Sequence, residues 1–158
     1  MKKIALIFTL FLLFKSASAQ LIFKPKEVIN LIGKDKKEVY QYLASKNYFY
    51  KKTNEFGFQE FVFDQDKEDD YKVNVRFVKN QLNAFFFETS ENDFDVVKNE
   101  LEANNFKFFS KMNTDGFVGK ERFAYGYIYK NYDKKINVGL EHRAEDDLTM
   151  LVNINAVK

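Results

Sequence analysis

The chain has 158 residues, with 25 Lys and Arg against 23 Asp and Glu and a formal net charge of +2. It contains no cysteine, which excludes disulfide bonds and lipid attachment to a cysteine. A charge this close to neutral gives no indication of a nucleic-acid partner or of an anionic membrane surface.

The first nineteen residues have the pattern of a secretory signal peptide. Lys2 and Lys3 precede the apolar run Ile4–Phe14, and Ala17–Ala19 forms a small-residue cleavage site. This apolar run is too short to span a bilayer stably. We therefore expect an exported, soluble protein in the periplasm or outside the cell. Its mature part, 20–158, is a single domain with a net charge near −1 and no membrane span.

Two helices are predicted at the start of the mature domain. Lys24–Gly33 gives a short one, because Pro25 suits a first helical position and Gly suits the stop. Asp35 and Glu38 form a capping box at the start of the second, and Asn47 is suited to a left-handed end. The apolar positions of the second helix are Val39, Tyr42 and Leu43.

Three strand-like runs follow this helix. Phe56–Phe63 has aromatic residues on both sides of the pleat, and the acidic turn Asp64–Asp70 separates it from Tyr71–Val78, which alternates apolar and polar residues. The next run, Leu82–Glu88, also alternates. One face of it carries Leu82, Ala84 and Phe86, and the other carries Asn83, Phe85 and Phe87.

A similar series follows in the second half of the chain. Ser90–Lys111 begins with Ser90 and Asp93 at capping-box spacing, and Asn104-Asn105 ends its helix. The apolar stripe of this helix consists of Phe94, Val97 and Leu101. The strands that follow are Lys120–Lys130, the alternating run Ile136, Val138, Leu140 and His142, and Leu148–Val157, with an acidic turn at Ala144–Asp147.

The two series indicate an α+β fold made of two pseudo-repeats, about 34–88 and 90–157. When Asn47-Tyr48 is aligned with Asn105-Phe106, Val39 falls on Val97 and Leu43 on Leu101. Each unit is a helix followed by an antiparallel meander, so we expect the helices to pack on one face of the sheet.

This layout resembles the β-lactamase inhibitory protein fold, a tandem repeat of helix and meander. The run Leu31–Val39 also resembles the Gly-then-Val helix start of that inhibitor and of small outer-membrane assembly lipoproteins. The chain departs from that inhibitor in having no cysteines, and no inhibitory residue carries over. The resemblance implies a binding module that uses its open sheet face or its loops.

The sequence offers no catalytic constellation. His142 is the only histidine and is interpreted as a strand-end residue without a catalytic role. The acidic turn at Asp64 lacks the glycine and glutamate of a calcium loop. Nucleophile motifs and phosphate-binding glycine loops are absent from the sequence. We expect a protein that is not an enzyme and that holds neither metal nor cofactor.

The aromatic residues are the unusual feature, and they give the candidate binding site. One layer of helices covers one sheet face only, so strands with aromatics on both sides must place some on the open face. For the tyrosines, the alternative that they belong to the core stays open. The candidate binding residues are Phe85, Phe87, Tyr125, Tyr127 and Tyr129.

Three functions follow from these patterns. The first is a non-enzymatic binding module that engages an unidentified protein partner through an aromatic-rich sheet face. The alternative is a carrier for a small apolar ligand or glycan, held between sheet and helices or on the tyrosine-rich strand. The third is a hydrolase that uses dispersed carboxylates.

Overall fold

A computed structural model describes residues 23–63, 72–112, 117–118, 121–143 and 149–157. The expected signal peptide, 1–19, and the acidic turns at 64–70 and 144–147 lie outside the described residues. The helical elements are α2 (Pro25–Leu31), α3 (Lys36–Ser45), the short 3-10 helix η2 (Glu91–Asp93) and α4 (Phe94–Ala103). The strands are β1 (Tyr48–Thr53), β2 (Phe58–Phe63), β3 (Lys72–Val78), β4 (Gln81–Ser90), β5 (Lys107–Met112), β6 (Phe117–Val118), β7 (Glu121–Asn131), β8 (Ile136–Arg143) and β9 (Thr149–Ala156).

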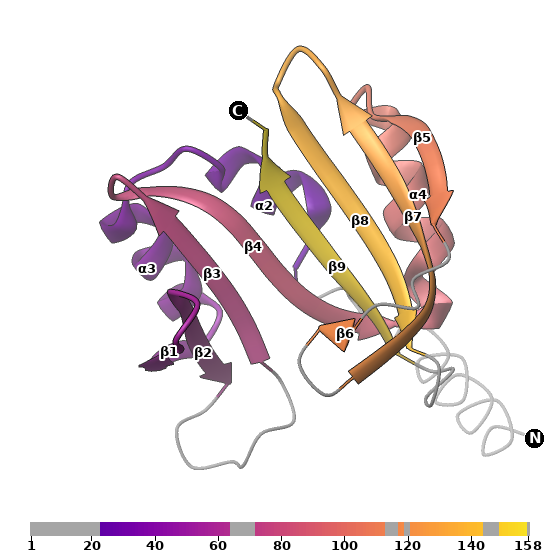
Figure 1. The fold of residues 1–158 in the computed structure, drawn as a ribbon. Helices are drawn as coiled ribbons and strands as arrows, with labels where there is room; N and C mark the ends of the chain where they lie inside the picture. Colours follow the sequence, from indigo (N-terminus) through magenta and orange to yellow (C-terminus); the bar gives the residue numbers. More distant parts are fainter. Residues whose placement is uncertain (1–22, 64–71, 113–116, 119–120, 144–148, 158) are drawn as a thin grey trace, which may run out of the picture.

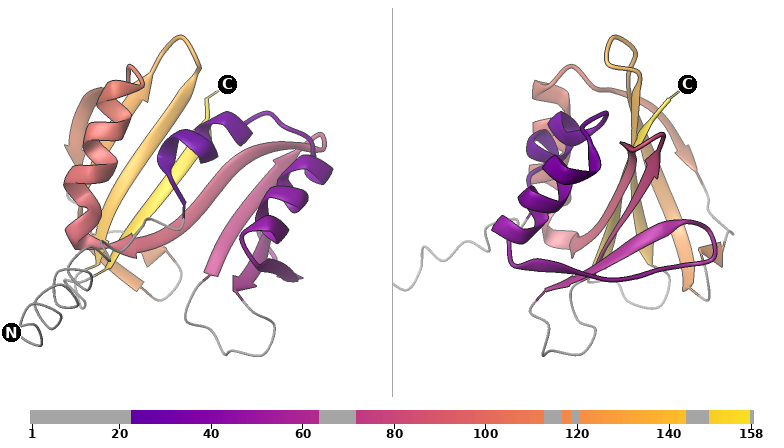
Figure 2. Two further views of the ribbon diagram at one scale, coloured as in Figure 1. Left: turned by 180° about the vertical axis from the view of Figure 1, so that it is seen from behind. Right: turned by 90° about the vertical axis from the view of Figure 1, so that its left-hand side faces the viewer.

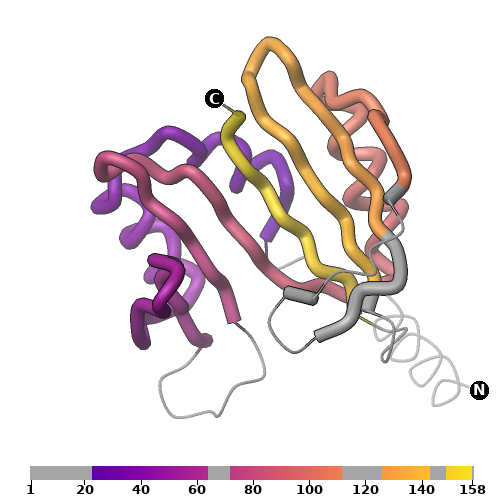
Figure 3. Tube along the Cα trace, in the orientation of Figure 1, coloured from indigo at the N-terminus to yellow at the C-terminus, as the bar shows by residue number. Residues whose placement is uncertain are grey.

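The expected α+β class is confirmed by an antiparallel sheet with helices on one side. Eight strands follow the order β1-β2-β3-β4-β9-β8-β7-β5, and β6 lies off this path and pairs with β7. Figure 1 shows the sheet from the face without helices, and Figure 3 traces its strands in the same orientation. In the two views of Figure 2, α2, α3 and α4 all lie on the opposite face. The side away from these helices is the open face.

Local chemistry sets the ends of both long helices. The amide of Glu38 donates to the Asp35 carboxylate at 2.9 Å, as the capping box predicts. Asn47 and Asn105 both adopt a φ of 63°, which ends each helix in the left-handed conformation expected for asparagine.

The start of the second long helix differs from the prediction. The Ser90 hydroxyl accepts the amide of Asn92 and begins η2, so α4 starts only at Phe94. The Asp93 carboxylate accepts the Thr89 hydroxyl at 2.7 Å. A carboxylate bound to Thr89 is directed away from the reciprocal bond of a capping box, and a tighter first turn results.

The core fills the space between the helices and the sheet. Val39 and Leu43 of α3 and Val97 and Leu101 of α4 are fully buried, as their helical spacing predicts. Phe23 lies at the centre of this layer, where its ring contacts four other aromatic rings. The strands contribute Tyr48, Phe61, Val73, Val75, Phe85, Phe87, Tyr129, Val138, Leu140, Met150, Val152 and Ile154.

Candidate functional site

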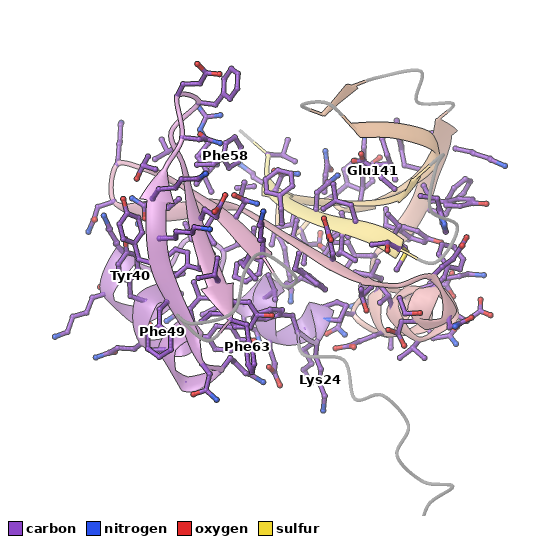
Figure 4. The ribbon with its side chains drawn as sticks, turned by 90° about the horizontal axis from the view of Figure 1, so that it is seen from below. Lys24, Tyr40, Phe49, Phe58, Phe63 and Glu141 are labelled. Atoms are coloured by element: carbon purple, nitrogen blue, oxygen red, sulfur yellow. The ribbon has the colours of Figure 1, made fainter. Side chains whose placement is uncertain are left out.

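An aromatic cluster lies on the open face, where β2, β3 and β4 are neighbours. Phe58 pairs with Arg76 across β2 and β3, and the Arg76 guanidinium lies 5.6 Å from the centroid of the Phe58 ring. The Phe58 ring also meets the Phe86 ring edge-on at 5.2 Å. Figure 4 shows Phe58 on the side of the sheet away from the helices. The cluster combines two rings with a cation held over one of them.

A polar network continues this surface across β8 and β9. The Asn153 side-chain amide donates to the Glu141 carboxylate. Its carbonyl oxygen accepts the Gly139 amide at 3.1 Å and the Asn155 side chain at 3.1 Å. Phe86 pairs directly with Asn153 across β4 and β9, so the aromatic cluster and this network are neighbours. Together they form the open-face patch: Phe58, Arg76, Phe86, Gly139, Glu141, Asn153 and Asn155.

The backbone of β8 makes room for this network. A β-carbon at Gly139 would lie 2.6 Å from the side-chain nitrogen of Asn153, which is closer than van der Waals contact permits. Burial raises the pKa of the Glu141 carboxyl, and the hydrogen bond from Asn153 opposes that rise. The patch therefore holds its polar side chains in fixed positions and presents a carboxyl group with weakened acidity.

The predicted placement of Phe85 and Phe87 on the open face is wrong. Their exposed fractions are 0% and 2%, and both rings contact Phe23 in the core. The reason is a register shift in β4: Arg76 pairs with Ala84, whereas Phe77 pairs with Leu82. Asn83, between these two β4 residues, is therefore unpaired, and the alternation of β4 shifts by one residue at this point. As a result, Phe85 and Phe87 do not lie on the same face of the sheet as Asn83.

The tyrosines of β7 also lie on the helix side as far as they are described. Tyr129 is 2% exposed, and Tyr127 packs partly buried against the core. Tyr125 pairs in register with His142, and its side chain lies outside the described part of the structure. Gly126 instead lies on the open side, where a β-carbon would meet Glu141 at 3.3 Å. The absence of a side chain at Gly126 makes room for the Glu141 side chain.

Sequence reasoning missed every residue of the open-face patch. The available signal was the alternation of β3 and β8: once Val73, Val75, Val138 and Leu140 are taken as core, the intervening residues must face away from the helices. Arg76 and Glu141 belong to those intervening sets.

His142 and Glu91 form a second cluster, on the helix side at the start of η2. His142 is 5% exposed, in phase with Val138 and Leu140 as predicted. Its Nδ1 lies 2.6 Å from the Glu91 carboxylate. The His142 ring also contacts the rings of Phe94 and Tyr127, at centroid distances of 5.6 Å and 6.0 Å. This contact joins β8 to the beginning of α4.

Two open cavities lie beside this cluster, between α4 and the strands. The first has a volume of about 370 Å³ and is lined by Glu91, Asn92, Phe94, Asp95, Tyr127 and His142. The second has a volume of about 450 Å³ and is lined by Phe94, Lys98, Glu102, Phe108, Tyr127 and Tyr129. Phe94 and Tyr127 line both, and we call the two together the α4 cleft.

Within the described ranges, no cluster of three or more His, Asp or Glu side chains is arranged to hold a metal ion. In the same residues no helix has the length and apolar character needed to cross a membrane. Comparison with protein-family models, with curated proteins and with solved structures gives no match for this chain. The fold itself defines the class, an α+β protein with one helix-covered and one open sheet face.

Proposed function

We propose that this chain is an exported, non-enzymatic binding module that engages a protein partner through its open sheet face. The observation that carries the proposal is the cluster of Phe58, Arg76 and Phe86 on the face that no described helix covers. Aromatic and arginine side chains are enriched at the energetically dominant positions of protein interfaces.

The rest of the open-face patch supports the same function. Asn153 and Glu141 are held by hydrogen bonds within the sheet, so little side-chain entropy is lost when a partner binds. Arg76 is exposed and is already positioned over the Phe58 ring. A protein partner would meet two rings, one cation and a row of amide groups without prior rearrangement of this surface.

The tandem repeat belongs to the same proposal. Each long helix ends at an asparagine with a φ of 63° and is followed by a buried aromatic residue, Tyr48 or Phe106. The strands β4 and β9, the last of each series, pair with each other at the middle of the sheet. These parallels favour two helix-and-meander units and a likeness to the β-lactamase inhibitory protein fold, in which an open sheet face is available for binding.

The test is an affinity capture with the chain 20–158 as bait, against envelope and culture-medium fractions of the source organism. The variant Phe58→Ala, Arg76→Ala removes one ring and the cation of the patch. The matched control, Val96→Ala, Lys37→Ala, truncates one exposed apolar and one exposed basic side chain on the helix side. Circular dichroism verifies that all three baits are folded.

We expect the wild type and the control to capture the same protein in similar amounts. The amount captured by the patch variant should be at least about tenfold lower. A photoreactive amino acid at position 151, next to the network on β9, should form a covalent adduct with the same protein. Equal retention by all three baits, or equal loss from both variants, would contradict the assignment of the open face.

A carrier for a small ligand is the second candidate, and the α4 cleft is the observation that favours it. Its cavities of about 370 Å³ and 450 Å³ lie in the size range of small-molecule sites. Native mass spectrometry of freshly purified protein tests this function. A co-purifying mass is the expected result, and repeated spectra of the bare chain would count against a tightly held ligand.

A further inference from the structure

The α4 cleft has an aromatic wall that suits a cation. Phe94 and Tyr127 meet at a centroid distance of 5.1 Å, and both rings contact the His142 ring. The Lys111 ammonium group lies 5.6 Å from the Tyr127 centroid, so this ring already interacts with one cation of the chain. Cation-π attraction acts within about 6 Å of a ring centroid.

The described residues that line the first cavity carry acidic charge, which the Lys111 ammonium beside Tyr127 offsets in part. Glu91 and Asp95 contribute carboxylates, and no described residue of the lining is Lys or Arg. The Glu91 carboxylate already contacts the His142 ring nitrogen, whereas Asp95 is exposed. A ligand without hydrogen-bond donors seated here would remove water from these carboxylates without replacing its hydrogen bonds, which costs free energy. An ammonium group replaces those bonds and adds charge attraction.

The second cavity differs in its chemistry. Lys98 and Glu102 contribute opposite charges, and the rings of Phe108 and Tyr129 provide much of the remaining wall. The pKa of the Tyr129 hydroxyl is raised by burial and further by the negative charges of Glu102 and Asp95. The charges of the described residues that line the second cavity therefore balance, and its wall is rich in aromatic carbon.

We propose that the α4 cleft binds a small organic ammonium ion with an apolar body. The ammonium group lies in the first cavity, between Asp95 and the face of Tyr127, and the apolar body lies against Phe108 in the second. This inference rests on the carrier candidate, whose ligand it changes from a neutral apolar molecule or glycan to a cation. It does not depend on partner binding at the open face.

The experiment compares three probes that each have a phenyl ring and two further carbons: phenethylammonium, neutral 2-phenylethanol and anionic phenylacetate. Each is titrated into the 20–158 chain and followed by calorimetry and by amide chemical shifts. We expect phenethylammonium to bind at least about tenfold more tightly than the alcohol, with phenylacetate the weakest. The shifted amides should belong to α4, β5, β7 and the end of β8. Lysine capped by acetyl and methylamide groups distinguishes a protein side chain from a free amine as the source of the ammonium group.

Two variants and one control locate the site. Asp95→Asn keeps the shape of the side chain and should weaken phenethylammonium binding about threefold while sparing the alcohol. Tyr127→Leu should remove the preference for the amine over the alcohol. Glu55→Gln makes the same change of net charge in the β1–β2 turn and should leave binding unchanged. Equal affinity for the amine and the alcohol would overturn the proposed preference for a cation and would leave a carrier of apolar ligands. If none of the probes bound, both the cation preference and the carrier function would be overturned.

Discussion

At position 139, the absence of a side chain leaves the space that the Asn153 carboxamide occupies. This contact ties the choice of glycine on β8 to a hydrogen-bond network on β9, because any β-carbon would displace the amide. The glycine is required by packing, since no positive φ is recorded at this position.

Gly139→Ala should therefore destabilise the fold by about 1–3 kcal/mol, because Asn153 must leave its hydrogen bonds to make room. Urea unfolding of the single variants and of the Gly139→Ala, Asn153→Ala double variant measures the coupling. The double variant should recover part of the loss. Strict additivity of the two single effects would mean that the clash is not the cause.

Glu141 gives a prediction about pH. Burial raises the pKa of its carboxyl above the ordinary 4.5, so the folded state binds its proton more tightly than the unfolded state does. Stability from this group is complete below pH 4.5 and is lost as the pH rises through the folded-state value.

Glu141→Gln should flatten this part of the stability curve and make the chain relatively more stable at neutral pH. Unfolding free energies measured at several pH values from 4 to 8 (about one-unit steps) test it. The exposed Glu55→Gln variant is the control and should run parallel to the wild type. A Glu141→Gln curve that is also parallel would contradict the raised pKa.

At the scale of the element, α3 begins at the capping residue that the sequence predicts, Asp35. Asp35→Ala removes the side chain that accepts the Glu38 amide and should cost about 1 kcal/mol of stability. Asp35→Asn keeps an acceptor and should cost less. Thermal unfolding monitored by circular dichroism distinguishes the two. Equal losses would mean that the charge near the helix start, rather than the hydrogen bond, is what matters.

At the scale of the whole molecule, the two sides of β4 give the sharpest test of the fold. Phe85 is fully buried between the sheet and Phe23, whereas its neighbour Phe86 lies in the open-face patch. Phe85→Ala should cost about 3–5 kcal/mol, the usual loss for a core phenylalanine. Phe86→Ala should cost clearly less, because water can fill the space. If urea unfolding showed the larger loss of stability for Phe86→Ala, the assignment of the covered and open faces would be wrong.

The sequence by itself determined the helix ends and the alternation along the strands, because these features depend on residues that are close together in the chain. Asp35, Asn47 and Asn105 predict helix ends because capping and left-handed conformations involve only a few consecutive residues. The alternation of β8 predicts that Val138, Leu140 and His142 share a face, because successive strand residues point to opposite sides.

Only the tertiary structure decided which face of the sheet the helices cover, and therefore which residues the open-face patch contains. Alternation gives two faces but does not say which is covered, and a single unpaired residue in β4 reverses its phase. The cluster of Phe58, Arg76 and Phe86 joins three strands, and the α4 cleft joins α4 to the strands β5, β7 and β8. Contacts between residues far apart in the chain depend on register and packing, which no local pattern of residues contains.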